Sequence, residues 1–242
     1  MEFKNLNSFY KNNLGKSVEI FVQQKIKSYI DIRPNKVVMG IGYTEKYLQH
    51  FQDNKCTTLS LIPSFIDNFY CDKNDINIIC EEDHLPISND SCDVFLLVHC
   101  LEHSNSPWGL MAEINRILPS GGKIIVVVPN RVGLWSRRTN NPFGSGRSYT
   151  KGQLKKLLNS TGFFELEIDY SIYYPPFNKF FNQKIFNFCE KFLKYILREN
   201  SGVILGVYEK RVHKYVKTKK KLFEIPLLKP NIALNKDYII KN

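Results

Sequence analysis

The stretch DVFLLVHCLEHSNSPWGLMAEINRILPSGGKIIVVV, residues 93–128, decides the fold. It opens and closes on short runs that are apolar at almost every position, which is typical of parallel strands covered by helices on both faces. Between these runs, Ser106 and Pro107 form a helix start, and apolar residues then recur at three- and four-residue steps. Strand, helix and strand in this order predict a βαβ unit of a parallel sheet.

Upstream of this unit, a glycine turn joins a predicted strand to a predicted helix. Residues 36–39 are a short apolar run, and Gly40 and Gly42 lead from it into a helical stretch at residues 44–51. Further strands are predicted at residues 56–62, 76–80, 163–170 and 203–208, and Thr150 with Gln153 predicts a capping box at the start of another helix. Together these elements predict a doubly wound, Rossmann-like α/β fold with a mostly parallel seven-stranded sheet and helices on both faces.

Three further segments accompany the predicted domain at residues 36–210. Residues 1–35 are an N-terminal helical segment, and residues 211–242 form a basic C-terminal tail. An insertion at about residues 175–199 carries a stripe of apolar residues at helical spacing, namely Phe181, Ile185, Phe188, Phe192 and Ile196. The stripe favours packing against the sheet, while a lid or a helix in peripheral contact with a membrane surface are the alternatives.

The composition excludes several classes of protein. With 43% hydrophobic and 24% charged residues the chain is typical of globular domains, and because it lacks a secretory signal and any long apolar run we expect a soluble, cytoplasmic protein. The six cysteines include no C-x-x-C pair, so neither a metal site nor a disulfide framework is expected. The net charge of +11 is dispersed except at residues 217–221, and without a motif it does not predict a nucleic-acid partner.

A long polar loop follows the second strand of the opening stretch. Residues 129–149 contain glycines and several arginines, and a connection of this length in a compact domain is usually functional. Guanidinium groups near one site favour an acidic acceptor such as a carboxylate or a phosphate. The candidate substrate-binding residues are Arg131, Arg147 and Tyr149, with Arg137 and Arg138 nearby.

Several blocks, in this order and spacing, resemble the class I S-adenosylmethionine-dependent methyltransferases of the small-molecule type. They are the acidic stretch with Leu-Pro at residues 81–93, Leu-Glu-His at 101–103 and Leu-Pro-Ser-Gly-Gly at 118–122. The resemblance covers about residues 36–162. It implies an enzyme that transfers a methyl group from S-adenosyl-L-methionine to a small or medium-sized acceptor, which the arginines of the long loop suggest is anionic.

The resemblance also implies roles for individual residues. The glycines of the first turn would lie against the methionine part of the cofactor, and Glu81 would accept a hydrogen bond from the adenine amino group. The implied cofactor-binding set is Gly40, Gly42, Tyr43, Glu81, Glu82, His84, Val98 and His99. His99, Glu102 and His103 follow the fourth strand, where a general base would reach the methyl group, although ordinary helix-start roles explain Glu102 and His103 equally well.

The sequence departs from the family pattern at two positions. Val38 replaces an acidic residue before the first glycine, and Ile62 replaces the carboxylate that binds the ribose hydroxyls. A charged hydrogen bond of that kind contributes about 1.5–3 kcal/mol, and the nearest polar substitutes, Tyr43 and Ser64, are neutral. Two interpretations stay open: a methyltransferase with a variant cofactor scheme, or a non-catalytic protein of this fold that acts as a binding or assembly partner.

Nothing after the predicted fourth strand resembles the Asn/Asp-Pro-Pro-Tyr motif that clamps a base amino group. Residues 98–101 read Val-His-Cys-Leu instead. The sequence therefore argues against a nucleic-acid methyltransferase.

Overall fold

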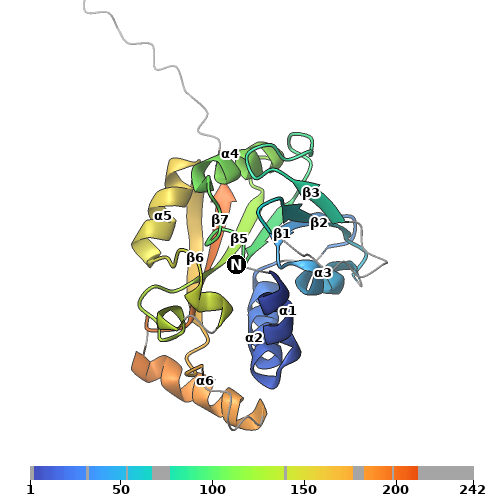
Figure 1. The fold of residues 1–242 in the computed structure, drawn as a ribbon. Coiled ribbons are helices and arrows are strands. Elements are labelled where there is room, and N and C mark those ends of the chain that lie inside the picture. The colour runs from blue at the N-terminus through green and yellow to red at the C-terminus, as the bar shows by residue number, and fades with distance from the viewer. Residues whose placement is uncertain are drawn as a thin grey trace, which may run out of the picture. The chain divides into compact units, whose positions relative to one another are not determined.

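A seven-stranded sheet forms the centre of the chain, in the order β3-β2-β1-β4-β5-β7-β6 (Figure 1). The strands are β1 Val37–Gly42, β2 Thr57–Pro63, β3 Asn77–Cys80, β4 Val94–Val98, β5 Lys123–Pro129, β6 Phe163–Ser171 and β7 Val203–Lys210. Strand β7 runs antiparallel to both β5 and β6, and the other neighbouring pairs are parallel. The predicted fold class is confirmed.

The structure is a computed structural model that describes residues 3–30, 33–52, 54–66, 77–138, 141–176, 183–197 and 199–211. The α-helices are α1 Phe3–Lys11, α2 Asn13–Tyr29, α3 Glu45–Gln52, α4 Pro107–Ile117, α5 Lys151–Ser160 and α6 Gln183–Leu197. Two 3₁₀ turns, η1 Trp135–Arg137 and η2 Pro142–Gly144, lie in the loop after β5. Except for Arg211, the predicted C-terminal tail lies outside the described residues, as does Phe181.

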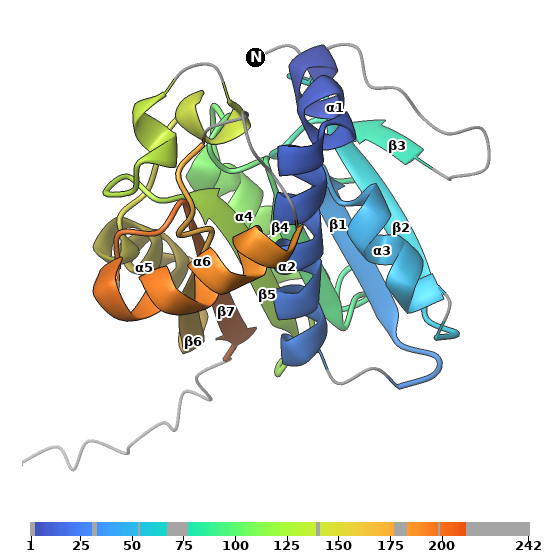
Figure 2. The ribbon, with the colours of Figure 1, turned by 90° about the horizontal axis from the view of Figure 1, so that it is seen from below.

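Helices cover the sheet on both faces (Figure 2). On one face, α1, α2, α3 and α6 share a hydrophobic cluster with the two 3₁₀ turns and with strand residues such as Leu96 and Val127. On the other face, α4 and α5 pack on the alternate strand residues, including Leu97 and Val126. This alternation explains why β4 is apolar at every position and β5 is apolar from Ile124 onward.

The helix starts show one confirmed cap and one that differs from the expectation. In α5, the Thr150 side chain accepts from Gln153 N while Gln153 accepts from Thr150 N, which is a capping box. At α4, Ser106 is the N-cap residue but its side chain forms no capping hydrogen bond. The carboxylate of Glu82 instead accepts from the backbone N–H of Asn105 and Ser106, at 2.9 and 2.7 Å.

The N-terminal segment consists of two helices that belong to the core of the domain. Asn12 caps α2 by accepting from Gly15 N at 2.8 Å. In α1, the side chains of Leu6 and Tyr10 are buried in the same cluster as the sheet. The sequence predicted a helical segment there, and the structure adds that α1 contributes to the edge of the sheet described below.

Asp169 on β6 joins two of the helices on this face to the sheet. Its carboxylate pairs with Lys25 of α2, accepts from the Tyr29 hydroxyl at 2.9 Å, and lies 3.7 Å from Lys194 of α6. Burial alone would raise the pKa of Asp169, but hydrogen bonds from Lys25, the Tyr170 N–H and Tyr29 outweigh it and lower this pKa. The ionised form of Asp169 therefore stabilises the fold.

Replacing Asp169 by Asn should lower the free energy of unfolding by about 1–2 kcal/mol at pH 7, because a charged hydrogen-bond acceptor is lost. The pKa of Asp169 is depressed on folding, so its contribution is full above the unfolded pKa of about 3.9 and disappears as the pH falls through the folded value. Urea titrations in neutral and increasingly acidic buffer measure the effect. Asp90→Asn, at a position whose side chain is 64% exposed, is the matched control and should change nothing; a deficit that persists in acid would contradict the charge explanation.

Candidate functional site

The glycine turn after β1 lies where the strand order reverses, between β1 and β4. Gly42 has φ of +91°, and a Cβ there would lie 2.3 Å from the carbonyl oxygen of Val98. Tyr43 N donates to that same oxygen at 2.7 Å. Only glycine permits this conformation and this close approach of β1 to β4. In doubly wound folds, ligands bind beside such a reversal, at the carboxyl ends of the strands.

A chain of three buried side chains lies at the carboxyl end of β4. His99 Nε2 is 2.7 Å from the Tyr10 hydroxyl, and His99 Nδ1 is 2.9 Å from Glu102 Oε1. The residues Tyr10, His99 and Glu102 are 1%, 2% and 3% exposed. His99 adopts φ of +51°, a conformation that is uncommon outside glycine and that surrounding contacts must hold.

The protons of this chain can be assigned from its chemistry. A carboxylate only accepts hydrogen bonds, so Nδ1 of His99 donates to Glu102 and Nε2 is left as an acceptor. Burial, together with the phenols of Tyr47 and Tyr43, raises the pKa of Tyr10 well above its ordinary value. The Tyr10 hydroxyl therefore stays protonated and donates to Nε2. The arrangement orients an imidazole with its basic nitrogen directed at α1.

Aromatic rings enclose this histidine. Tyr10 stacks on Tyr43 with ring centroids 4.5 Å apart, and Phe143 lies 4.8 Å from the His99 ring. Tyr10 was absent from the sequence-derived candidates, although the buried positions Leu6 and Tyr10 lie one helical turn apart and mark an inward face of α1. Phe143 belongs to the long loop, so this loop also contributes to the α1 side of the sheet.

Two polar atoms beside the chain have no hydrogen-bond partner among the described residues. They are Glu102 Oε2 and His103 Nε2. Burial lowers the pKa of His103, which keeps its ring neutral near pH 7. His103 packs against Gly146, so the structure places it beside the long loop, whereas His99 faces α1. The catalytic roles of His99, Glu102 and His103 remain predictions.

The three residues of the acidic stretch that the sequence grouped together have different surroundings in the structure. Glu81 follows β3 and is exposed, so its carboxylate is accessible where an adenine ring was expected. Glu82 is buried and holds the start of α4, with an added hydrogen bond from the Ser104 hydroxyl. The His84 side chain is 86% exposed and pairs with Asp83. The structure therefore gives Glu82 a scaffold role, while cofactor contacts at all three residues stay predictions.

At the carboxyl end of β2, the structure has an apolar residue where the family pattern has a ribose-binding carboxylate, as the sequence indicated. Ile62 is buried and pairs in register with Ile79 of β3. Ser64, the polar residue that follows, is exposed. The described residues that end β2 therefore place no carboxylate at the position where the family binds ribose.

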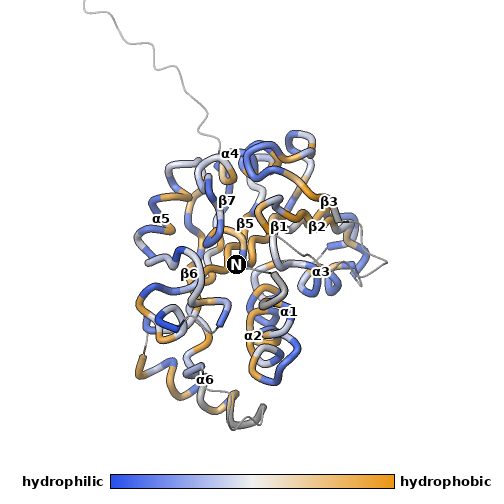
Figure 3. Tube along the Cα trace, viewed as in Figure 1, coloured by the Kyte–Doolittle hydropathy of each residue, from blue (hydrophilic) through white to orange (hydrophobic). Residues whose placement is uncertain are grey.

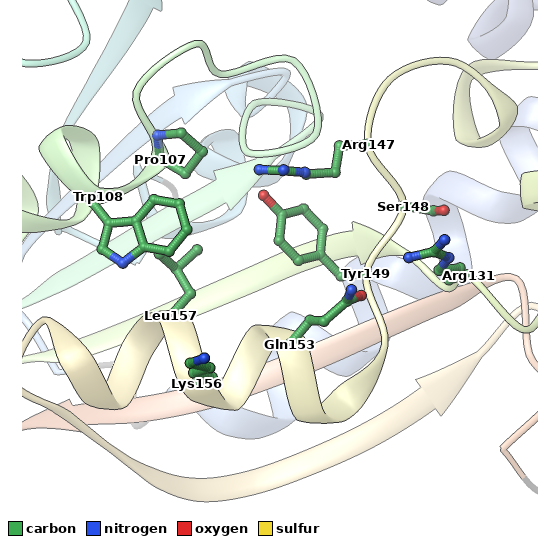
Figure 4. A pocket seen from close by; sticks show the side chains of 9 residues that line it. All are labelled: Pro107, Trp108, Arg131, Arg147, Ser148, Tyr149, Gln153, Lys156 and Leu157. Carbon is green, nitrogen blue, oxygen red and sulfur yellow. The ribbon is translucent and has the colours of Figure 1, made fainter.

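The predicted substrate residues Arg131, Arg147 and Tyr149 line one pocket, a cavity of about 260 Å³ between the long loop, α4 and α5 (Figure 4). The remaining lining residues are Pro107, Trp108, Ser148, Gln153, Lys156 and Leu157. Within the described part of the chain, this lining includes three cationic groups and no carboxylate. Burial raises the pKa of Tyr149 to about 12, although the adjacent Arg147 guanidinium acts in the opposite direction.

Trp108, Gln153 and Lys156 were missed by the sequence analysis. Gln153 and Lys156 are three residues apart on the first turns of α5, directly after the loop. That spacing was the available indication, because such positions share one side of a helix.

The two groups of candidate residues lie on opposite sides of the segment between β4 and α4. Arg147 N donates to the carbonyl of Glu102 at 2.7 Å, and the Tyr149 hydroxyl donates to the carbonyl of Leu101 at 3.2 Å. The side chains of His99 and Glu102 point to the α1 side of this segment. Arg147 and Tyr149 of the long loop thus hydrogen-bond to this segment on the side away from the His99 and Glu102 side chains.

The strand order, the antiparallel β7 and the glycine turn at the reversal are those of the class I S-adenosylmethionine-dependent methyltransferase fold. The profile of the family described as "Methyltransferase domain" matches residues 36–126, which span β1 to most of β5. No functionally curated protein matches the chain.

Solved structures with this fold come from several kinds of protein. A methyltransferase of Archaeoglobus fulgidus is 13% identical, with a TM-score of 0.58 over 78% of this chain and 93% of that one. A complex of the Haloferax volcanii Trm112 methyltransferase activator with a methyltransferase gives 14% identity and a TM-score of 0.59, over 85% and 97%. The [4+2]-cyclase SpnF gives 15% and 0.55, over 79% and 80%. At these identities the likeness shows the fold alone.

Among the described residues, no group of three or more His, Cys, Asp or Glu side chains could hold a metal ion. None of the described helices is long and apolar enough to cross a bilayer.

Gly146 is the residue whose replacement should test the packing behind the histidine site. It has φ of +81°, and a Cβ there would lie 2.6 Å from the Glu102 carbonyl oxygen. Gly146→Ala should therefore lower the free energy of unfolding by about 2 kcal/mol or more. Gly152→Ala, where a Cβ meets nothing within 4 Å, should be neutral or slightly stabilising. Chemical denaturation compares the two variants, and equal stabilities would refute the packing as described.

Proposed function

We propose that this chain transfers the methyl group of S-adenosylmethionine to a small or medium-sized anionic acceptor. The observation that carries the proposal is the buried pair of His99 and Glu102 next to the glycine turn, at the reversal of strand order. When bound, the cofactor supplies an electrophilic methyl group. The protein then needs to hold the acceptor in line, exclude water and take up a proton.

The residues around the glycine turn fit this cofactor in kind and position. Gly40 and Gly42 keep side chains away from the end of β1, and the exposed carboxylate of Glu81 ends β3. Val98 is the last residue of β4 and His99 follows it, while Tyr43 starts the connection to α3. Because Ile62 leaves the ribose without a carboxylate, we expect a dissociation constant about tenfold or more above that of a family member that has one.

His99 has the properties of a base in this reaction. Glu102 fixes the imidazole and leaves Nε2 as the acceptor of a proton, so Glu102 acts as a positioning residue. In the structure, the Tyr10 hydroxyl occupies Nε2 of His99. Together with Tyr43 and Phe143, it keeps water away from this nitrogen. An acceptor that loses its proton to Nε2 takes the place of the Tyr10 hydroxyl.

The acceptor class follows from the charges of the second pocket. Arg131, Arg147 and Lys156 offer cationic groups, and Trp108 offers an apolar surface. A ligand with a carboxylate or phosphate joined to an apolar body matches this lining. We assign to this pocket the anionic end of the acceptor, whose reacting end must then extend past the segment between β4 and α4 to reach His99 Nε2.

A second candidate function is a non-catalytic binding or assembly partner. The buried Ile62 at the ribose position favours it, and a structural neighbour is found in a complex with an activator protein. In that case the folded chain has no measurable affinity for S-adenosylmethionine.

Calorimetric titration with S-adenosylmethionine tests the cofactor site through two adjacent carboxylates. Glu81→Ala should weaken binding by about tenfold or more, because a hydrogen bond to a charged group is lost, and should leave stability unchanged. Glu82→Ala should instead lower the free energy of unfolding by about 2 kcal/mol or more, because the donors at the start of α4 lose their acceptor. A wild-type protein that is folded but does not bind the cofactor supports the assembly role.

Methyl transfer from labelled S-adenosylmethionine to a panel of small carboxylates and phosphate monoesters, with neutral and cationic analogues of each, tests the acceptor class. On an acceptor found in this way, Arg147→Ala should raise KM by about tenfold or more and leave cofactor affinity unchanged. Arg137, which is exposed and does not line the described pocket, provides the matched control as Arg137→Ala. Acceptors that are all cationic or neutral, with Arg147→Ala as active as the parent, would refute an anionic acceptor.

A further inference from the structure

Helix α6 presents an exposed apolar stripe. The stripe consists of four side chains on one side of the helix, at successive steps of four, three and one residues. They are Phe188, Phe192, Tyr195 and Ile196, which are 69%, 56%, 84% and 60% exposed. The rings of Phe188 and Phe192 stack with centroids 6.1 Å apart. Figure 3 shows apolar residues recurring along α6, far from β3. Exposed clusters of this size on a protein surface mark interaction sites.

The opposite side of α6 anchors it to the domain. Phe186 is buried against Phe21 of α2, with centroids 4.9 Å apart. Glu190 is buried and accepts from the backbone N–H of Ile172 and Tyr173, each at 2.7 Å. The expectation that the stripe packs against the sheet is therefore wrong for Phe188, Phe192 and Ile196, because Phe186 and Glu190 occupy the inward side. The fixed helix holds the stripe toward solvent.

Within α6, the described charges exposed beside the stripe are cationic. Lys191 and Lys194 are exposed along one flank of it, although Lys194 also lies near Asp169. The one acidic residue in the sequence of α6 is Glu190, which the anchor described above occupies. The outward side of α6 thus combines aromatic residues with cations, and the chain as a whole carries +11.

We propose that α6 lies in the surface of an anionic phospholipid bilayer. Its stripe would lie at the boundary between headgroups and acyl chains, and its lysines would contact lipid phosphates. Amphipathic helices with aromatic residues and flanking lysines bind in this way, through buried apolar area and attraction to anionic lipids. A second copy of the chain is a poorer occupant, because a symmetric contact would bring two strongly cationic chains together. Tyr195, with an apolar ring and a polar tip, suits the boundary between lipid and water.

Co-sedimentation of the full chain with vesicles tests the proposal. The protein should bind vesicles of phosphatidylcholine mixed with phosphatidylglycerol, bind those of phosphatidylcholine alone much more weakly, and lose affinity as salt is added. The double variant F188S/F192S should bind the anionic vesicles at least about tenfold more weakly, and Lys191→Gln about fivefold more weakly. Ile79→Ser, which removes an exposed apolar side chain from β3, is the matched control and should bind as the parent does.

Two results would overturn the proposal. F188S/F192S retains the basic run at residues 217–221, so unchanged binding by this variant would assign the attraction to charge elsewhere in the chain. Alternatively, light scattering that shows a dimer dissociating in F188S/F192S, with no vesicle binding by the parent, would make the stripe a contact between copies. Circular dichroism and S-adenosylmethionine titration of the same variants establish that they are folded and that the cofactor proposal stands or falls separately.

Discussion

The buried carboxylate of Glu102 is the constraint on which the functional edge of this domain depends. One of its oxygens holds the imidazole of His99, and its backbone carbonyl accepts from Arg147 N. The first bond holds the segment after β4 in its own conformation, and the second ties this segment to the loop after β5. Since a charge at 3% exposure is costly without partners, the segment has little freedom to adopt another conformation. The positive φ of His99 persists because these contacts hold it.

This constraint gives the edge of the sheet two faces with different chemistry. Toward α1, the imidazole is enclosed by Tyr10, Tyr43 and Phe143. Toward α4 and α5, guanidinium groups and Tyr149 line an open pocket. The same segment of backbone separates the two, and its residues Leu101 and Glu102 form hydrogen bonds with the long loop.

The sequence predicted the framework well because the framework depends on local patterns. The apolar runs of β4 and β5, the glycine turn and the cap at Thr150 each express a rule that acts within a few residues. Tyr10 was not predicted to meet His99, because that contact joins positions 89 apart in the chain. Glu82 likewise caps a helix from a distance in sequence, where a pattern search assigns the task to Ser106. On α6, spacing identified an apolar stripe but not its direction, since Phe186 and Phe188 belong to opposite sides of one helix.

The position of α6 in the topology has a consequence for what holds this helix in place. The helix lies in the connection between β6 and β7, which are adjacent and antiparallel. Two strands in that relation require only a tight turn to join them. The sheet therefore does not require a helix in this connection, whereas the parallel crossovers elsewhere need a long connection. The strand order by itself would therefore survive a longer, shorter or different connection between Ser171 and Val203. What fixes α6 in this chain is its own packing, through Phe186 and Glu190, and not a demand of the sheet.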